Sequence, residues 1–304
     1  MLSLALKNIA GKSFGALIKD KVNIVIELTK FRITTFVTLT TVFGFICATG
    51  KITNSIIAPV IGVLLLSSGS AVVNHFQERD TDALMDRTKN RPIPSGRISA
   101  ANALLISLIL IISGSAVLFF GVGTGAFLLG LLNLFWYNGV YTPLKRVYAL
   151  AIIPGSLVGA IPPMIGWVAG GGHILDWQII ILSFFFFIWQ IPHFWLLLLV
   201  FGKDYEQAGF PTLTKIFNHY QLAKITFIWI LATAVTSFLI PFFGIVKSPV
   251  IQFTLLLPGL WLAVNSFKLL NETKGRYLFR SAFMNINIFA VVVVIILSFD
   301  KLFI

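Results

Sequence analysis

The segment from Asn74 to Pro94 reads NHFQERDTDALMDRTKNRPIP, and it follows directly on an apolar run that is too long for a soluble core helix. Only 11% of the chain is charged, yet this segment is dense in both signs of charge: Glu78, Arg79, Asp80, Asp82, Asp86, Arg87, Lys89 and Arg91. Such a cluster at the end of a membrane span is costly unless something binds there. The segment therefore predicts a membrane helix with a binding site at its end.

The composition of the 304 residues is that of a polytopic membrane protein, with 57% hydrophobic residues and a mean hydropathy of +0.92. Residues 33–304 are expected to form a single transmembrane domain. Residues 1–32 are expected to be a cytoplasmic segment without a cleavable signal peptide, in which the stretch 18–28 could form an interfacial helix. Apolar runs joined by short loops predict an all-α fold of about nine spans, at roughly 33–49, 54–75, 101–120, 124–141, 149–168, 177–200, 222–241, 250–268 and 281–299.

Basic residues are distributed very unequally between the two sides of the predicted domain. Of the 23 lysines and arginines, all but Lys51, Lys247 and Lys301 precede the first span or follow spans two, four, six and eight. The positive-inside rule then places the N-terminus in the cytoplasm and the C-terminus outside. The net charge of +12 is explained by topology and anionic lipid rather than by nucleic acid. We expect a bacterial inner membrane and an active face on the cytoplasmic side.

The acidic residues of the first charged segment recur every four positions. On a helix, Asn74, Glu78, Asp82 and Asp86 would form one oxygen-rich stripe. Like charges at this spacing destabilise a helix by about a few tenths of a kcal/mol, and a divalent cation would reverse that effect. Mg²⁺ prefers oxygen ligands and commonly bridges to a substrate phosphate. The stripe therefore indicates a metal site, the alternative being a solvated helix end.

Cations that follow the stripe suit a phosphate group. Arg87 and Arg91 belong to a run with Lys89 and Arg97, and arginine contacts phosphate through a planar fork. Anchoring to lipid headgroups is the alternative for these loop residues. Four spans later, Lys203 could hold a leaving phosphate, and the acidic side chains beside it, Asp204 and Glu206, could complete a metal site across the bundle.

His193 lies within the sixth predicted span, in the sequence WQIPHFW. An imidazole at this depth is a candidate functional group, either as a haem-iron ligand, as a base, or as a hydrogen-bonding residue. His75 adjoins the acidic stripe. Aromatic residues make up 14% of the chain, and rings that line a cavity can stabilise a carbocation.

The pattern at 74–92 resembles the first acidic motif of the intramembrane prenyltransferases related to the 4-hydroxybenzoate polyprenyltransferases. The similarity is strongest to the haem-farnesylating branch of that family. Further segments resemble this branch and extend the likeness over nearly the whole chain: Leu28–Ile33, Ala160–Trp167, Trp189–Trp195, Lys203–Pro211 and Leu278–Ser281.

This resemblance implies a ring of nine helices around a central cavity open to lipid. The implied reaction transfers the farnesyl group of farnesyl diphosphate to a vinyl group of haem B, giving haem O and diphosphate. A haem A synthase or a terminal oxidase is the implied downstream partner. The implied site roles are Mg²⁺ on Asn74, Glu78, Asp82 and Asp204, diphosphate on Arg87, Arg91 and Lys203, haem propionates on Lys145 and Arg146, and haem near His193.

The chain departs from the family pattern at three positions. Glu78 stands where aspartate is usual, the second motif offers Asp204 and Glu206 rather than DxxxD, and Phe31 replaces a common proline. Two other functions remain open at this point. The acceptor could be a quinone precursor such as 4-hydroxybenzoate or a chlorophyll-type ring, or the protein could be an ion-coupled transporter or lipid-binding protein. A transporter would more often place its carboxylates near the membrane midplane.

Overall fold

The computed structural model describes residues 14–270 and 275–304, so residues 1–13 of the predicted N-terminal segment lie outside the description. Within these ranges the chain is helical and contains no strand, which confirms the all-α prediction. The elements are α2 (Phe14–Leu28), α3 (Phe31–Thr49), η1 (Asn54–Ile56), α4 (Ile57–Asp82), α5 (Ala100–Gly121), α6 (Thr124–Phe135), η2 (Trp136–Tyr141), α7 (Thr142–Leu144), α8 (Ile152–Gly155), α9 (Leu157–Ala169), α10 (Trp177–Gln207), η3 (Leu213–Lys215), α11 (His219–Leu239), η4 (Ile240–Phe243), α12 (Pro249–Thr254), α13 (Leu256–Ser266), η5 (Phe267–Leu270) and α14 (Gly275–Phe303).

Eight helical stretches in the described ranges are long and apolar enough to cross a membrane, which makes this a multi-pass membrane protein. The predicted fourth span, 124–141, is not among these eight stretches. It is built as α6 followed directly by the π-helical turn η2, and the short α7 continues the chain beyond Tyr141. Single π-turns inside helices occur frequently at functional sites, and this one faces the acidic end of α4, as described below.

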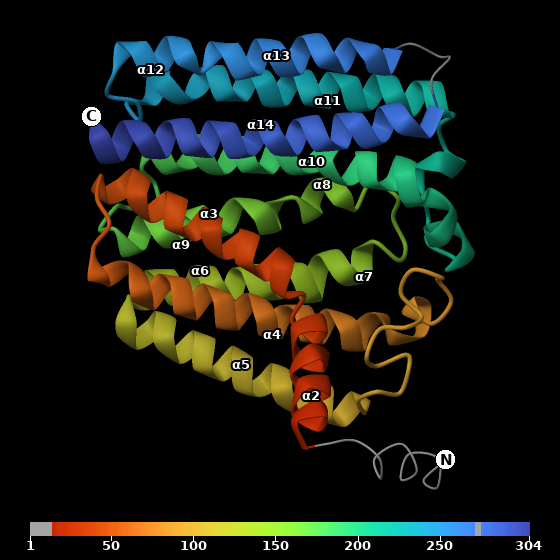
Figure 1. The fold of residues 1–304 in the computed structure, drawn as a ribbon. Helices are drawn as coiled ribbons and strands as arrows, with labels where there is room; N and C mark the ends of the chain where they lie inside the picture. Colours follow the sequence, from red (N-terminus) through yellow and green to blue (C-terminus); the bar gives the residue numbers. More distant parts are fainter. Residues whose placement is uncertain (1–13, 271–274) are drawn as a thin grey trace, which may run out of the picture.

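The long helices run side by side, and segments far apart in sequence become neighbours (Figure 1). Helices α3 and α9 approach each other closely, because glycines allow the two backbones to touch. A Cβ on Gly44 would lie 2.0 Å from the carbonyl oxygen of Pro163, and one on Gly166 would lie 1.9 Å from that of Thr41. In lipid, where burial of apolar surface gives little drive, such close packing is a main source of helix association.

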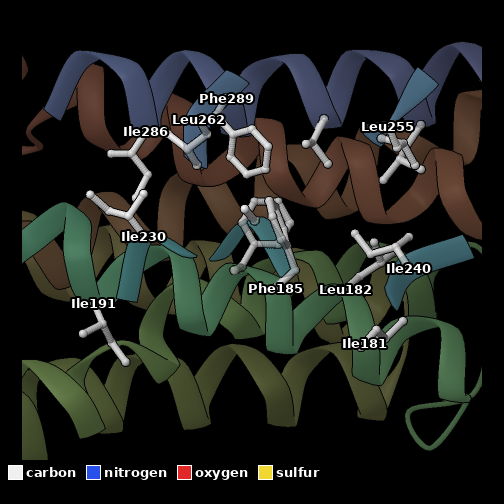
Figure 2. Close-up of a cluster of buried hydrophobic side chains, with 14 of the residues drawn as sticks. Ile181, Leu182, Phe185, Ile191, Ile230, Ile240, Leu255, Leu262, Ile286 and Phe289 are labelled. Carbon is white, nitrogen blue, oxygen red and sulfur yellow. The ribbon is translucent and has the colours of Figure 1, made fainter. Parts of the chain in front are cut away.

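A cluster of buried hydrophobic side chains joins α10, α11, α13 and α14 (Figure 2). Phe185 of α10 and Phe289 of α14 are 1% and 0% exposed, with ring centroids 6.1 Å apart. Ile230 of α11 and Leu262 of α13 are buried members of the same cluster. Large hydrophobic residues on the outer face of α5 are exposed, as expected for a lipid-facing surface: Leu105, Leu108, Ile109 and Ile112.

The charged loops gather at one end of the bundle. The segments 83–99 and 208–218 both lie there, at the right of Figure 1, together with the link after α7. Helix α2 lies crosswise to the long helices at this end, an orientation that suits the predicted interfacial helix. Its last turn is tied to the first charged loop, because Arg97 donates two hydrogen bonds to Glu27, at 3.0 and 2.5 Å. These contacts place the candidate site at one face of the membrane domain.

Candidate functional site

The last two turns of α4 carry the predicted oxygen-rich stripe, and three of its four members are buried. Asn74, Glu78 and Asp82 are 0%, 7% and 0% exposed. Asp86 lies beyond the end of α4, where it is exposed and accepts a hydrogen bond from Lys89 at 2.7 Å. The stripe therefore offers one amide and two carboxylates to the interior, each four residues apart on one helical face.

Each member of the buried stripe contacts a cation from a different part of the chain. Lys30, between α2 and α3, donates to Asn74 Oδ1 at 2.6 Å. Arg91, in the charged loop, contacts both carboxylate oxygens of Asp82, at 2.7 and 2.6 Å. Lys145, directly after α7, forms an ion pair with Glu78. Arg91 and Lys145 balance the two carboxylates, and Lys30 adds positive charge whenever it is protonated, which favours an anionic ligand such as a phosphate.

The two lysines have opposite pKa shifts, each with a distinct cause. Burial, together with the positive charge of the nearby Arg91, lowers the pKa of Lys30 to about 7. Burial would also lower the pKa of Lys145, but the carboxylate of Glu78 outweighs this effect and the pKa lies above its usual value. Lys145 therefore stays charged at neutral pH, whereas Lys30 is sensitive to the charge of whatever binds beside it.

Lys30 also has an unusual backbone conformation. Its φ of 48° and ψ of 47° are left-handed, and in the described part of the chain no other non-glycine residue has a positive φ. A left-handed conformation costs roughly 1–2 kcal/mol for a residue with a Cβ. Strain of this kind is often found at functional sites, where the surrounding structure maintains it.

The π-helical turn η2 is clasped to α4 by a set of side-chain hydrogen bonds. Asn138 accepts from Ser70 Oγ at 2.6 Å and donates to the Ser70 carbonyl at 3.1 Å and to Gln77 Oε1 at 3.2 Å. Gln77 in turn donates to the Asn138 carbonyl at 2.8 Å, and Asn74 donates to Thr142 at 3.2 Å. These bonds fix the start of the segment that carries Lys145.

Sequence reasoning missed Lys30, Gln77 and Asn138 as parts of this site. A signal was present for Asn138, since it is a polar residue in the predicted fourth span, beside Gly139 in the sequence WYNGVY. Lys30 belongs to the segment Leu28–Ile33, whose likeness to the family was the signal for it.

The second half of the predicted site lies at the end of α10. Lys203 and Asp204 line a cavity of about 1140 Å³, open to the charged face, whose wall includes Asn218 and His219. Glu206 accepts hydrogen bonds from Thr212 at 3.2 Å and from Thr214 at 2.5 Å, so it organises the turn after α10. This cavity is bounded by α10, α11 and α14, whereas the stripe belongs to α4.

The two halves approach one another without forming one cluster of ligands. The Arg87 guanidinium lies 5.7 Å from the ring centroid of Phe201 on α10, and Lys145 Nζ lies 6.0 Å from that of Phe210. Nowhere in residues 14–270 and 275–304 do three or more His, Cys, Asp or Glu side chains converge as a metal site. Asp204 as a fourth metal ligand with Asn74, Glu78 and Asp82 therefore remains a prediction.

The residues predicted to bind haem have separate surroundings. Arg146 donates to the carbonyl oxygen of Gln77 and lines a small cavity of about 230 Å³ beside α7. Lys145 forms its ion pair with Glu78. His193 is half-buried on α10, with Nδ1 2.9 Å from Asn287 Oδ1 of α14. His75, by contrast, is 1% exposed on α4, and no described residue gives either of its ring nitrogens a hydrogen bond of normal geometry.

Aromatic rings connect these two regions. Tyr141 stacks with Tyr137, with ring centroids 5.9 Å apart, and with Phe194 at 6.4 Å. Lys145 Nζ lies 5.4 Å from the Tyr141 centroid. Phe194 is the neighbour of His193 on α10, so the rings extend from the acidic stripe toward the imidazole. Such π faces can stabilise positive charge in a site that excludes water.

Comparisons with known proteins agree with this fold and identify the family of the chain. The model of the UbiA prenyltransferase family matches residues 37–289. The protoheme IX farnesyltransferase of Oleidesulfovibrio alaskensis is 31% identical over 277 residues, which are 91% of this chain and 95% of that protein. The Geobacter sulfurreducens protoheme IX farnesyltransferase is 40% identical over 203 residues, 67% of this chain and 75% of that protein.

The fold is also similar to that of solved structures. A UbiA homolog from Archaeoglobus fulgidus, bound to GPP and Mg²⁺, matches with a TM-score of 0.67 over 90% of this chain and 99% of that chain. Its sequence identity is only 14%, so this likeness concerns the fold alone. The resemblance inferred from the motifs is confirmed, and the chain belongs to the UbiA prenyltransferase family.

Proposed function

We propose that this prenyltransferase transfers the farnesyl group of farnesyl diphosphate to a vinyl group of haem B. Water adds its hydroxyl group to the carbocation formed on the side chain and a proton is released, giving haem O and diphosphate. The relatives named above as protoheme IX farnesyltransferases support this acceptor. The single observation that carries the chemistry is the buried stripe of Asn74, Glu78 and Asp82 with its three attached cations. No other described part of the chain combines buried carboxylates with this much positive charge.

The stripe fits Mg²⁺ by the chemistry of its donors, because an amide oxygen and two carboxylates are hard oxygen ligands. Asn74, Glu78 and Asp82 would hold the metal from α4, and Asp204 would complete the site from α10. When bound, Mg²⁺ supplies electrostatic stabilisation for the departing diphosphate. Arg91 pairs with Asp82 and Lys145 pairs with Glu78, so we expect Arg91 to turn toward the phosphates and Lys145 toward the haem propionates when both carboxylates bind the metal.

The cationic side chains have distinct roles in this proposal. Arg87, Arg91 and Lys203 bind the diphosphate, and their positive charge favours breakage of the allylic carbon–oxygen bond because negative charge builds up on the leaving group. The stacked rings of Tyr137, Tyr141 and Phe194 stand beside this position and keep water from the allylic cation. No protein nucleophile is required.

The acceptor is placed on the α10 side of the same face. His193 would lie near the haem, and Arg146 and Lys145 would bind its propionates once Lys145 has released Glu78. The active face is proposed to be cytoplasmic and the location a bacterial inner membrane, in line with the basic loops at that end. A haem A synthase or a terminal oxidase would then receive the product.

The proposal is tested by turnover of purified protein in nanodiscs with haem B, farnesyl diphosphate and Mg²⁺. Mass spectrometry should detect haem with a farnesyl group and a hydroxyl group added, and EDTA should abolish this product. The same reaction with 4-hydroxybenzoate serves as the acceptor control. Farnesylation of 4-hydroxybenzoate but not of haem would overturn the acceptor and keep the reaction class, whereas neither product from folded protein would favour transport.

A further inference from the structure

Helices α10 and α14 are joined inside the bundle by two polar contacts one helical turn apart. Trp189 donates through Nε1 to the carbonyl oxygen of Ile286 at 3.0 Å. His193, four residues later on α10, contacts Asn287 Oδ1 through Nδ1 at 2.9 Å. Burying a polar pair this deep in a membrane helix costs desolvation free energy that apolar residues would not cost. Such a pair is therefore a candidate for a functional role.

The orientation of the Asn287 amide follows from its other partner. Its Nδ2 donates to the backbone carbonyl of Phe283 at 2.5 Å, one turn earlier on α14. The reversed amide would bring two acceptor oxygens together at Phe283, so Oδ1 must face His193. An acceptor at this position requires the hydrogen of the neutral imidazole on Nδ1, which leaves the lone pair on Nε2.

Aromatic rings hold this imidazole in place. The centroids of Trp189 and Phe283 both lie 4.8 Å from that of His193, and Phe194 lies at 5.5 Å. Among the described residues, none forms a hydrogen bond with Nε2. The ring is therefore fixed in position and tautomer, and the lone pair of Nε2 has no partner among the described residues.

We propose that Asn287 is a positioning residue that holds His193 in the Nδ1–H tautomer, so that Nε2 binds the iron of the haem acceptor. This inference rests on the proposed function. A hydrogen bond to the distal nitrogen is the usual device by which proteins orient a metal-binding imidazole, and its loss typically weakens metal binding 10–100-fold. His75 lacks such a device, since its buried ring has no hydrogen-bonding orienter of normal geometry among the described residues.

The position also suits the reaction. Contacts run from His193 to Phe194 at 5.5 Å, from Phe194 to Tyr141 at 6.4 Å and from Tyr141 to Lys145 Nζ at 5.4 Å. Lys145 is paired with Glu78 of the acidic stripe. An iron held by Nε2 would thus set the macrocycle beside the site proposed for the diphosphate, where a vinyl group can meet the allylic cation.

The test combines haem binding with spectroscopy of the purified protein in nanodiscs. Haem B is titrated into wild type and into the variants N287L, N287D and H193G, and into H173A as a control, because His173 is exposed in the loop before α10. Resonance Raman spectra of the ferrous complexes report the iron–imidazole stretching vibration. Folding of each variant is checked by thermal unfolding without haem.

We expect N287L to bind haem about tenfold or more weakly and to lower the iron–imidazole frequency, because the imidazole loses its acceptor. N287D should retain binding and raise that frequency, since a carboxylate is a stronger acceptor. H193G should lose the vibration and regain it with added imidazole, and H173A should match wild type. A merely structural role of Asn287 would not move the vibration.

An unchanged vibration in N287L, or in H193G without added imidazole, would overturn the inference. Haem farnesylation is measured in parallel on the same preparations. If wild type farnesylates haem while H193G keeps an unchanged spectrum, the positioning role fails and the proposed function stands. If folded wild type produces no farnesylated haem, the proposed function itself fails.

Discussion

Arg91 contacts both carboxylate oxygens of Asp82, at 2.7 and 2.6 Å, and the aspartate is fully buried. A pair with this geometry locks the charged loop onto the end of α4. The carboxylate proposed to hold the metal is thus also a partner of a guanidinium, so substitutions at such pairs affect both catalysis and stability.

Replacing Asp82 by asparagine should abolish catalysis while the fold is kept. The amide still accepts a hydrogen bond from Arg91, but it removes the negative charge proposed to hold Mg²⁺. We expect turnover to fall by roughly 10²–10³-fold or more, the size of loss seen when one electrostatic contact to a transition state is removed. Farnesyl transfer measured across a Mg²⁺ titration checks this. Mg²⁺-dependent activity at the wild-type level would refute the metal assignment.

The buried ion pair of Lys145 with Glu78 should respond differently to single and double substitution. K145M leaves Glu78 charged and unpaired, which costs about 3–5 kcal/mol for a buried pair. The double variant E78Q/K145M removes both charges and should regain most of that stability. Both variants should be inactive, since both groups have roles in the proposed site. Unfolding free energies in detergent give the comparison, and equal stability of the single and double variants would contradict the coupling.

The sequence allowed one half of this site to be predicted, because its spacing is local. Asn74, Glu78 and Asp82 share a face as soon as residues 57–82 form one helix. Their partners could not be predicted in this way. Lys30 and Lys145 reach the stripe through tertiary contacts that depend on how α2, α3 and α7 pack.

The detailed structure of the fourth predicted span also depends on tertiary contacts that the sequence pattern does not show. Its apolar pattern predicted one regular helix over 124–141, whereas hydrogen bonds from Asn138 to α4 accompany a π-turn there. The cavity at Lys203 and Asp204 likewise depends on how α10, α11 and α14 diverge, which no local pattern encodes. The sequence therefore predicts most of the helices and the end of the bundle at which the charged residues lie. The contacts that bring the site residues together depend on how the helices pack.

The clasp between η2 and α4 gives a third prediction. N138L leaves Ser70 and Gln77 without their partners in a buried region, and we expect a loss of about 1–3 kcal/mol in unfolding free energy. Turnover should also fall, because the segment that carries Lys145 loses its anchor. The matched control is S67A, since Ser67 only bonds to the Leu64 carbonyl of its own helix at 3.2 Å. A loss of stability in S67A as large as in N138L would argue against a specific clasp.

Lys30 allows backbone strain and amine chemistry to be separated with two substitutions. K30G and K30A both remove the amine that contacts Asn74 at 2.6 Å. Glycine adopts the left-handed conformation of φ 48° without penalty, whereas alanine retains a cost of roughly 1–2 kcal/mol. We therefore expect the unfolding free energy of K30G to exceed that of K30A by about 1 kcal/mol. Both variants should transfer farnesyl poorly, because positive charge is lost beside the stripe.

Equal unfolding free energies of K30G and K30A would mean that the α2–α3 junction relaxes out of the left-handed conformation once the lysine is gone. Wild-type turnover in K30G would mean that Lys30 shapes the junction and takes no part in binding the diphosphate.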